Sequence, residues 1–206
     1  LGQRLTARPN LKVILVTPRE GDLVPAPFAR RAFAQRKEAV DLLTAAAPGR
    51  VVAFHPSGFP GRFAQLRSAV VIVDDVWSLT GATHLRRRGM TFDGSAAVAS
   101  FDRNIVAGYS QKVQAQRVAL MAARLGVARF DAAGLPVPEF LRLARPSSAF
   151  ALIRDLLAQN GAGMIQPLWH GPQDATILPQ TDDIADPDGT NGAPGGLGLA
   201  AFLSEA

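Results

Sequence analysis

Apolar residues along the chain fall into two patterns, short unbroken runs and positions at helical spacing. Short apolar runs predict strands at four places: 11–17, 51–56, 69–75 and 96–101. Apolar positions at helical spacing predict helices at three places: 27–46, 108–125 and 149–159. Strands that alternate with helices predict an α/β fold, in which we expect one mixed central sheet flanked by helices.

Turn-forming residues bound these elements. Gly49 follows the first predicted helix and Gly126 follows the second, as expected of residues that end helices. The segment 76–81 comes directly after two aspartates at the end of a strand, so we expect it to return as the hairpin partner of that strand. From about residue 171 the chain is rich in Asp, Gly and Pro. We therefore expect one domain over residues 1–170 and an irregular acidic tail over 171–206.

The net charge of +5 conceals an asymmetry between the two parts of the chain. Residues 1–129 hold 19 Lys and Arg against 8 Asp and Glu, a balance of +11, and residues 130–206 hold 3 against 9, a balance of −6. Of the 22 basic residues, 19 are arginine, whose planar guanidinium suits bidentate contacts with phosphate. This balance favours an anionic partner for the first part, and the alternative is a biased composition on a solvated surface.

Several functional classes are excluded by what the sequence lacks. It has no cysteine, so it can form neither a disulfide nor a thiolate metal site, and the redox compartment stays open. No apolar run reaches the roughly 18 residues that a membrane-spanning helix needs. We expect a soluble chain, with the cytoplasm slightly favoured. No two histidines have the spacing of metal ligands, so we expect no zinc site and no cofactor, and we interpret His55, at the end of an apolar run, as structural.

Residues 67–102 read RSAVVIVDDVWSLTGATHLRRRGMTFDGSAAVASFD. This segment resembles the signature of the phospholipase D superfamily, which runs H-x-K-x4-D-x6-G-S-x-N. Asp74 and Gly81 match the second half of that spacing, with six residues between them. The likeness continues through Arg87-Arg88-Gly89 and into the helix QAQRVALMAARLGV, so it covers roughly residues 10–127.

The rest of the signature is degenerate. Arg67 and Ala69 stand where the family has histidine and lysine, and Ala82 and His84 stand where it has serine and asparagine. The resemblance implies a mechanism in which histidine attacks phosphorus while the other side chains hold the phosphate oxygens. Arg67 cannot replace the nucleophile, because a guanidinium stays protonated and has no lone pair to offer, although it can bind phosphate.

The resemblance leaves His84 and Asp74 as the candidate catalytic residues. His84 either acts as a nucleophile or only donates a hydrogen bond in place of the asparagine amide, and Asp74 could pair with Arg67. The candidate phosphate-binding residues come from the same segment: Arg67, Thr83, Arg87 and Arg88. The run of three arginines at 86–88 is either a phosphate-binding edge or a structural feature. In the structural interpretation, one of them reaches back to a nearby aspartate: Asp74, Asp75 or Asp93.

The resemblance also implies that a complete site takes two motifs, from two halves of one chain or from two subunits. We therefore expect this chain to be the C-terminal half of a two-half protein, catalytically impaired, that serves as a binding or assembly module with phosphate or anion recognition. The alternative is a phosphodiesterase (a phospholipase or a nuclease) that is active only with a second, intact half. The expected partner is the missing N-terminal half or a second copy, bound through an exposed motif edge near Trp77 and Leu79. The candidate ligands are a phosphodiester, a nucleic acid or a lipid headgroup.

Overall fold

A computed structural model describes residues 1–18, 26–59, 62–64, 66, 68–82, 95–106, 109–159 and 164–168 of the 206-residue chain. Its helices are α1 (Gly2–Ala7), α2 (Ala26–Ala46), α4 (Gln111–Leu125), α5 (Pro138–Leu143) and α6 (Pro146–Ala158). Its strands are β1 (Val13–Val16), β2 (Val51–Phe59), β3 (Arg62–Phe63), β4 (Ala69–Val73), β5 (Trp77–Gly81), β6 (Ala97–Phe101), β7 (Ile105–Val106), β8 (Tyr109–Ser110) and β9 (Ile165–Pro167). The predicted tail over 171–206 lies outside the described residues.

The first sheet is built around β2. Strand β1 runs parallel to β2, β9 runs antiparallel to it, and β3 pairs with its last residues. Phe54 shows the arrangement most clearly, because it pairs with Val16 on one side and with Pro167 on the other. A parallel neighbour needs a crossover connection, and α2 lies between β1 and β2 in the chain and supplies it.

The second sheet is an antiparallel meander. Strands β4 and β5 form a hairpin in which Val73 pairs with Trp77 and Ala69 pairs with Gly81. Strand β6 then lies along the other side of β5, with Phe101 opposite Trp77. Strands β7 and β8 form a separate small hairpin directly before α4.

The α/β class is confirmed, but the expectation of one central sheet is wrong. The predicted strands divide between two sheets, with β1 and β2 in one and β4 and β6 in the other. The reason is local pairing: β4 forms a hairpin with β5, and β6 pairs with the other side of β5, so these three strands make a sheet of their own. Strand β9, only three residues long, was not predicted from the apolar pattern.

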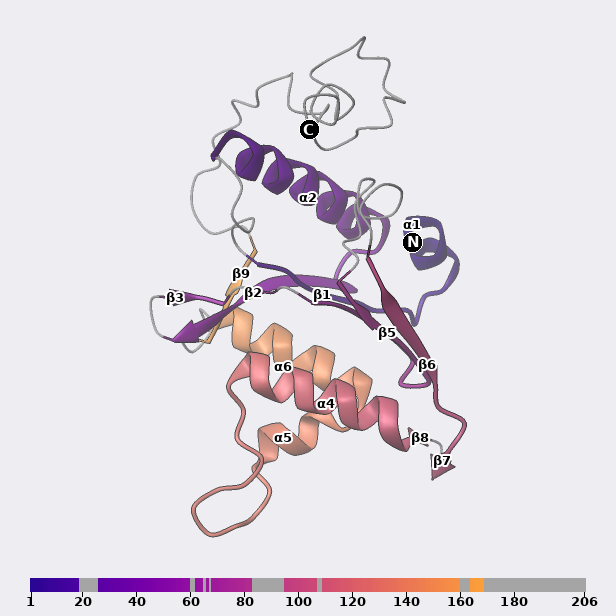
Figure 1. The fold of residues 1–206 in the computed structure, drawn as a ribbon, viewed down its shortest axis with the longest axis vertical. Coiled ribbons are helices and arrows are strands. Elements are labelled where there is room, and N and C mark those ends of the chain that lie inside the picture. The colour runs from indigo at the N-terminus through magenta and orange to yellow at the C-terminus, as the bar shows by residue number, and fades with distance from the viewer. Residues whose placement is uncertain are drawn as a thin grey trace, which may run out of the picture.

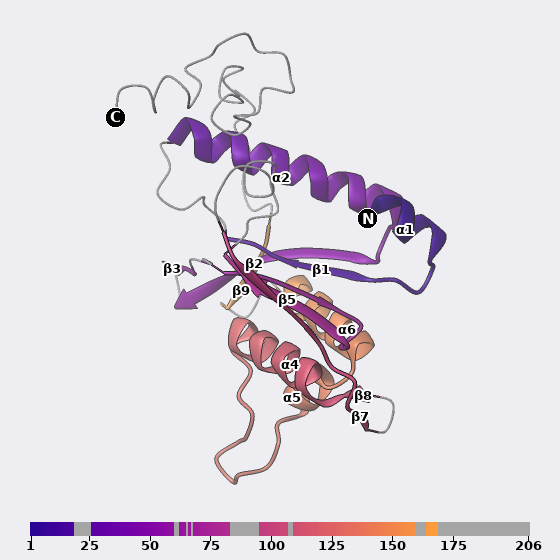
Figure 2. The same ribbon diagram turned by 45° about the vertical axis from the view of Figure 1, so that its right-hand side comes forward.

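Helices cover both faces of the first sheet. Figures 1 and 2 show α2 on one side of β1 and β2 and the group α4, α5 and α6 on the opposite side. The buried core lies on the second of these sides, where side chains of β2, β9, α4, α5 and α6 meet: Val52, Phe54, Ala122, Leu125, Leu143, Ala149, Phe150, Leu152, Ile153 and Ile165. Within the described part of the chain, no helix combines the length and the apolar character needed to cross a bilayer.

Two helix boundaries show how local sequence sets the fold. Gly126 ends α4 with a backbone φ of 68°, a left-handed conformation that glycine adopts at little cost, which confirms the predicted end of this helix. The last long helix was predicted from residue 149, but α6 begins earlier, at Pro146. Proline is favoured in the first turn of a helix, because its φ is already helical and its missing N–H needs no partner.

We expect the core between the first sheet and α6 to dominate the stability of the chain. Leu152 is 2% exposed in α6, whereas Leu42 is 65% exposed in α2. Leu152→Ala should lower the free energy of unfolding by about 2–5 kcal/mol, since it removes buried apolar contacts and leaves a cavity. The matched change Leu42→Ala should alter it by less than about 0.5 kcal/mol in urea-induced unfolding. Equal costs for the two variants would contradict this assignment of the core.

Candidate functional site

Most of the predicted site residues lie outside the described part of the chain. Arg67, Thr83, His84, Arg87 and Arg88 are all among the residues that the structure leaves undescribed. Their assignment as catalytic or phosphate-binding residues therefore stays a prediction. The structure does describe Asp74, Asp75, Gly81 and Ala82, together with the strands that carry the motif.

The motif aspartate, Asp74, and the neighbouring Asp75 lie in the turn between β4 and β5. Asp74 and Asp75 have φ values of 50° and 57°, and the N–H of Val76 donates to the carbonyl of Val73 at 3.1 Å. Both central residues thus have positive φ, and the pairing of Val73 with Trp77 leaves three residues, 74–76, in the connection. Aspartate tolerates this left-handed region better than most residues, so the Asp-Asp pair favours the hairpin.

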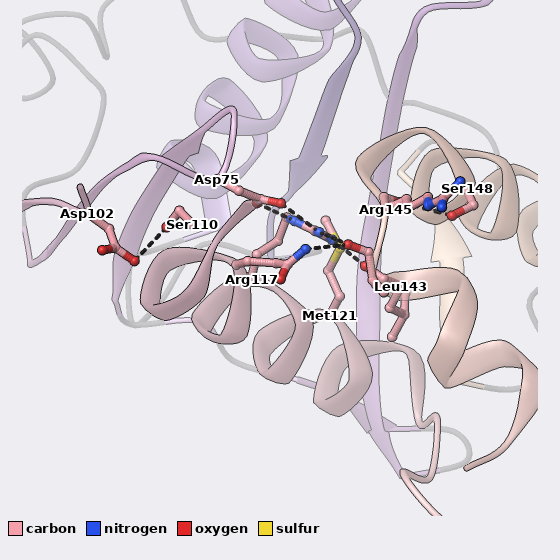
Figure 3. A network of polar contacts seen from close by, with 10 residues as sticks. Asp75, Asp102, Ser110, Arg117, Met121, Leu143, Arg145 and Ser148 are labelled. Atoms are coloured by element: carbon pink, nitrogen blue, oxygen red, sulfur yellow. Dashed lines mark hydrogen bonds and ion pairs between the residues drawn. The ribbon is translucent and has the colours of Figure 1, made fainter. Parts of the chain in front are cut away.

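The side chains of these two aspartates lie in different surroundings. Asp74 is exposed, whereas Asp75 is only 3% exposed. Figure 3 shows Asp75 facing Arg117 of α4 in a bidentate ion pair: Nε to Oδ1 at 2.6 Å and Nη2 to Oδ2 at 2.9 Å. Arg117 also donates from Nη1 to the carbonyl of Leu143 at 2.7 Å and from Nη2 to that of Ala144 at 3.1 Å. One guanidinium thus connects the motif turn, α4 and the segment that joins α5 to α6.

Gly81, the motif glycine, is explained by close packing. A Cβ atom at this position would lie 2.5 Å from the carbonyl oxygen of Ala96 and 2.6 Å from the Cα of Ala97. These are backbone atoms at the start of β6, so any side chain would force β5 and β6 apart. The motif glycine therefore has a structural role in this chain.

Asp74 lies at the turn end of the hairpin, far from the end at which β4 begins and β5 finishes. Asp74 lies at the turn, whereas Ala69 and Gly81 pair at the opposite end of the hairpin. The length of β5 puts roughly 14 Å between these ends at the usual rise of a strand. In the sequence, Arg67 and Thr83 lie two residues beyond Ala69 and Gly81. The described part of the hairpin therefore places Asp74 at the end opposite to Ala69 and Gly81.

Asp102 is a second buried carboxylate that the sequence analysis missed. It follows β6 and accepts hydrogen bonds from the Ser110 hydroxyl at 2.6 Å, the Lys112 N–H at 2.6 Å and the Asn104 N–H at 2.9 Å. The Ser110 hydroxyl, followed by the N–H groups of Asn104 and Lys112, lowers the pKa of Asp102 from 3.8 to about 2. Because Lys112 lies in the first turn of α4, Asp102 acts as a remote N-terminal cap of that helix (Figure 3).

The remaining candidates have structural surroundings. His55 is completely buried in β2 beside Gln166 of β9, as expected for a structural histidine. Trp77 and Leu79 are half-buried, and Val73 and Phe101, which pair with Trp77 on either side, are exposed. The binding of a partner near these residues stays a prediction. Among the residues that the structure describes, no group of three or more His, Asp or Glu side chains is arranged to hold a metal ion.

The sequence held a signal for the Arg117 pair. Arg117 lies four residues after Val113 and four before Met121, within the buried face of α4. A charged residue on the apolar face of a helix needs a buried partner of opposite charge. Either of the two consecutive aspartates of the turn could be this partner. The alternation of side chains along a strand does not tell which aspartate faces inward.

No protein-family model, curated protein or solved structure matches the chain. The likeness to the phospholipase D superfamily therefore rests on the residues of the segment 67–102 and its flanks.

We expect the Asp75–Arg117 pair to be needed for stability. Asp75→Asn should lower the free energy of unfolding by about 3–5 kcal/mol, because it leaves a buried guanidinium without its counter-charge. The control is Asp155→Asn, which breaks the exposed pair with Arg142 (2.6 Å) and should cost about 0–1 kcal/mol. Urea-induced unfolding measures both, and a cost for Asp75→Asn as small as that of the control would contradict the assigned role.

We expect Asp102 to contribute to the acid stability of the chain. Its pKa is lower in the folded state, so its stabilising contribution is complete above the unfolded value of 3.8 and is lost as the pH falls through about 2. NMR titration of the Asp102 carboxyl carbon should give a midpoint near 2, and Asp102→Asn should flatten the acid limb of the stability curve. A midpoint near 3.8 would show that the Ser110 and backbone hydrogen bonds do not hold the carboxylate.

Proposed function

We propose that this chain is a phospholipase-D-like half-domain that has lost hydrolytic activity and serves as a binding and assembly module for a phosphate-bearing ligand. The observation that carries the proposal is the buried pair of Asp75 and Arg117, 2.6 Å apart. It gives Asp75, the neighbour of the motif aspartate Asp74, a structural role in a chain that lacks the motif histidine and lysine. In this interpretation the fold has been retained while the chemistry has been lost.

The substitutions remove the nucleophile and two donors but keep the capacity for anion binding. Ala69 brings no positive charge and Ala82 brings no hydroxyl, so neither can hold a developing negative charge on phosphate oxygens. Arg67 offers a fixed fork of N–H donors that suits phosphate, and His84 can add one more donor. These residues together favour recognition of a phosphate group without attack on phosphorus.

The charge distribution supports an anionic ligand. The balance of +11 over residues 1–129 includes Arg67 and the run of three arginines at 86–88. A phosphodiester, a nucleic-acid backbone and a lipid headgroup share the same charged group, and all would meet this basic segment favourably. The proposed partner in assembly is a half-domain that carries the other motif, or a second copy of this chain.

The purified chain should show no hydrolysis of bis(4-nitrophenyl) phosphate above the buffer rate, because no intact nucleophile and donor set is present. His84→Ala should leave this background unchanged. Turnover in the wild type that disappears in His84→Ala would overturn the proposal and make His84 catalytic. Turnover that appears only on adding a separate chain with an intact motif would favour the alternative, a phosphodiesterase that needs a second half.

Anion recognition is tested on the same preparation. Inorganic phosphate should raise the melting temperature by mass action on the folded state, by the equivalent of about 2.7 kcal/mol at a concentration one hundred times Kd. The double variant Arg87→Gln/Arg88→Gln should reduce the shift. The charge-matched control, Arg145→Gln/Arg154→Gln at two exposed positions near and in α6, should keep it. Equal shifts in the two double variants would exclude a role for the arginine run.

A further inference from the structure

Strand β6 is exposed to solvent along its whole length. Each of its five residues is exposed, on both faces of the strand, and the two large ones, Val98 and Phe101, are 69% and 63% exposed. Among the described strands, β6 pairs only with β5, so within this part of the chain no strand pairs with the backbone donors and acceptors of its other edge. The exposed apolar surface continues into β7, where Ile105 and Val106 are also exposed. Figure 1 shows β6 at the outer side of its sheet, leading directly into β7.

This edge lacks the features that normally prevent strand-to-strand association. Natural proteins protect free edges with lysine, proline, bulges or inward-facing charges. The sequence of β6, AVASF, contains no charged residue and no proline, and its pairing with β5 is regular along the full length. An open edge without protection is suited to pairing with another strand.

The hydrogen bonds next to β6 identify the backbone groups that face outward. The N–H of Asp102 donates to the carbonyl of Val76 at 2.9 Å, and the N–H of Ala82 donates to that of Ala96 at 3.3 Å. In an antiparallel ladder, hydrogen-bonded positions alternate, so Val98 and Ser100 direct their backbone groups toward β5. The alternate residues direct theirs to the open edge: Ala97, Ala99 and Phe101.

We infer that β6 pairs with β6 of a second copy of this chain, antiparallel about a twofold axis at Ala99. In this register Ala97 lies opposite the partner's Phe101, Ala99 lies opposite the partner's Ala99, and Phe101 lies opposite the partner's Ala97. Each of these three pairs joins residues whose backbone groups both face outward, so each can exchange two hydrogen bonds. The two three-stranded sheets would then form one continuous sheet.

The side chains fit this symmetric arrangement. Each large Phe101 side chain meets a small alanine across the strands, and each Val98 meets the partner's Ser100, so no two bulky residues collide. No charge lies within the strand, so the twofold axis brings no like charges together along it. A surface that is complementary to itself about a twofold axis favours an isologous dimer over an unlike partner.

This inference deepens the assembly part of the proposed function, but it rests on β6 and does not require phosphate binding. Analytical ultracentrifugation of the full chain should give a reversible dimer. Ala99→Pro should weaken dimerisation by about tenfold or more, because it removes an outward N–H while the ladder to β5 uses Val98 and Ser100. Ala99→Lys should do the same, since two like charges would lie directly opposite each other.

The control for the charged variant is Val73→Lys, which places the same charge on an exposed apolar position of β4 in the same sheet. It should dimerise like the wild type. Circular dichroism and melting temperature at low concentration establish that each variant is folded. The rise in melting temperature on adding phosphate is measured on the same variants. Because it reports anion recognition alone, a failure of dimerisation can be told apart from a failure of phosphate binding.

The register can be tested by cross-linking, because the chain has no cysteine of its own. The Cα atoms of a hydrogen-bonded antiparallel pair lie about 5.5 Å apart, within the range of a disulfide. Ala99→Cys should therefore form a covalent dimer under mild oxidation much faster than Val73→Cys. The inference is overturned by a wild type that stays monomeric at high concentration, by an unchanged dimer in both Ala99→Pro and Ala99→Lys, or by equal cross-linking of the two cysteine variants.

Discussion

The buried pair of Asp75 and Arg117 is the interaction on which the arrangement of this chain depends. Arg117 has five N–H donors, and its partners are a carboxylate in the turn of the second sheet and two carbonyls at the junction of α5 and α6. A buried charge is tolerated only when it is neutralised and fully hydrogen-bonded. The position of the turn relative to the helical layer is therefore fixed by the geometry of one guanidinium, and Asp102 fixes the start of the same helix from β6.

The hydrophobic pattern was sufficient for the elements that have strong local signals. The α/β class, the hairpin after the two aspartates and the end of α4 at Gly126 follow from periodicity and turn chemistry. Division into two sheets did not follow, because an apolar run does not show which other strand it pairs with. Strand β9 was missed for a different reason, since three residues are too few to show a period. The local pattern shows which face of a helix or strand is buried, but it does not show which strands pair with one another.

The candidate site was less predictable than the fold. Spacing identified Asp74 and Gly81 as matches to a catalytic signature, yet Gly81 is required by the backbone of Ala96 and Ala97, and the buried aspartate is Asp75. A linear motif does not distinguish a residue kept for chemistry from one kept for packing, because both occupy the same position in sequence. The distinction needs the environment of each side chain, which here gives structural roles to Asp75 and Gly81.

The position of β9 has a consequence for how the chain folds during synthesis. Ile165 belongs to the main core, and the strand that carries it pairs with β2 from the first third of the sequence. Until this strand has left the ribosome, one edge of β2 stays open and the core stays incomplete. Contacts between such distant segments slow folding and lengthen the exposure of unpaired edges. The nascent chain therefore passes through a stage in which β1 and β2 have been synthesised but the edge of β2 that β9 will cover is still open.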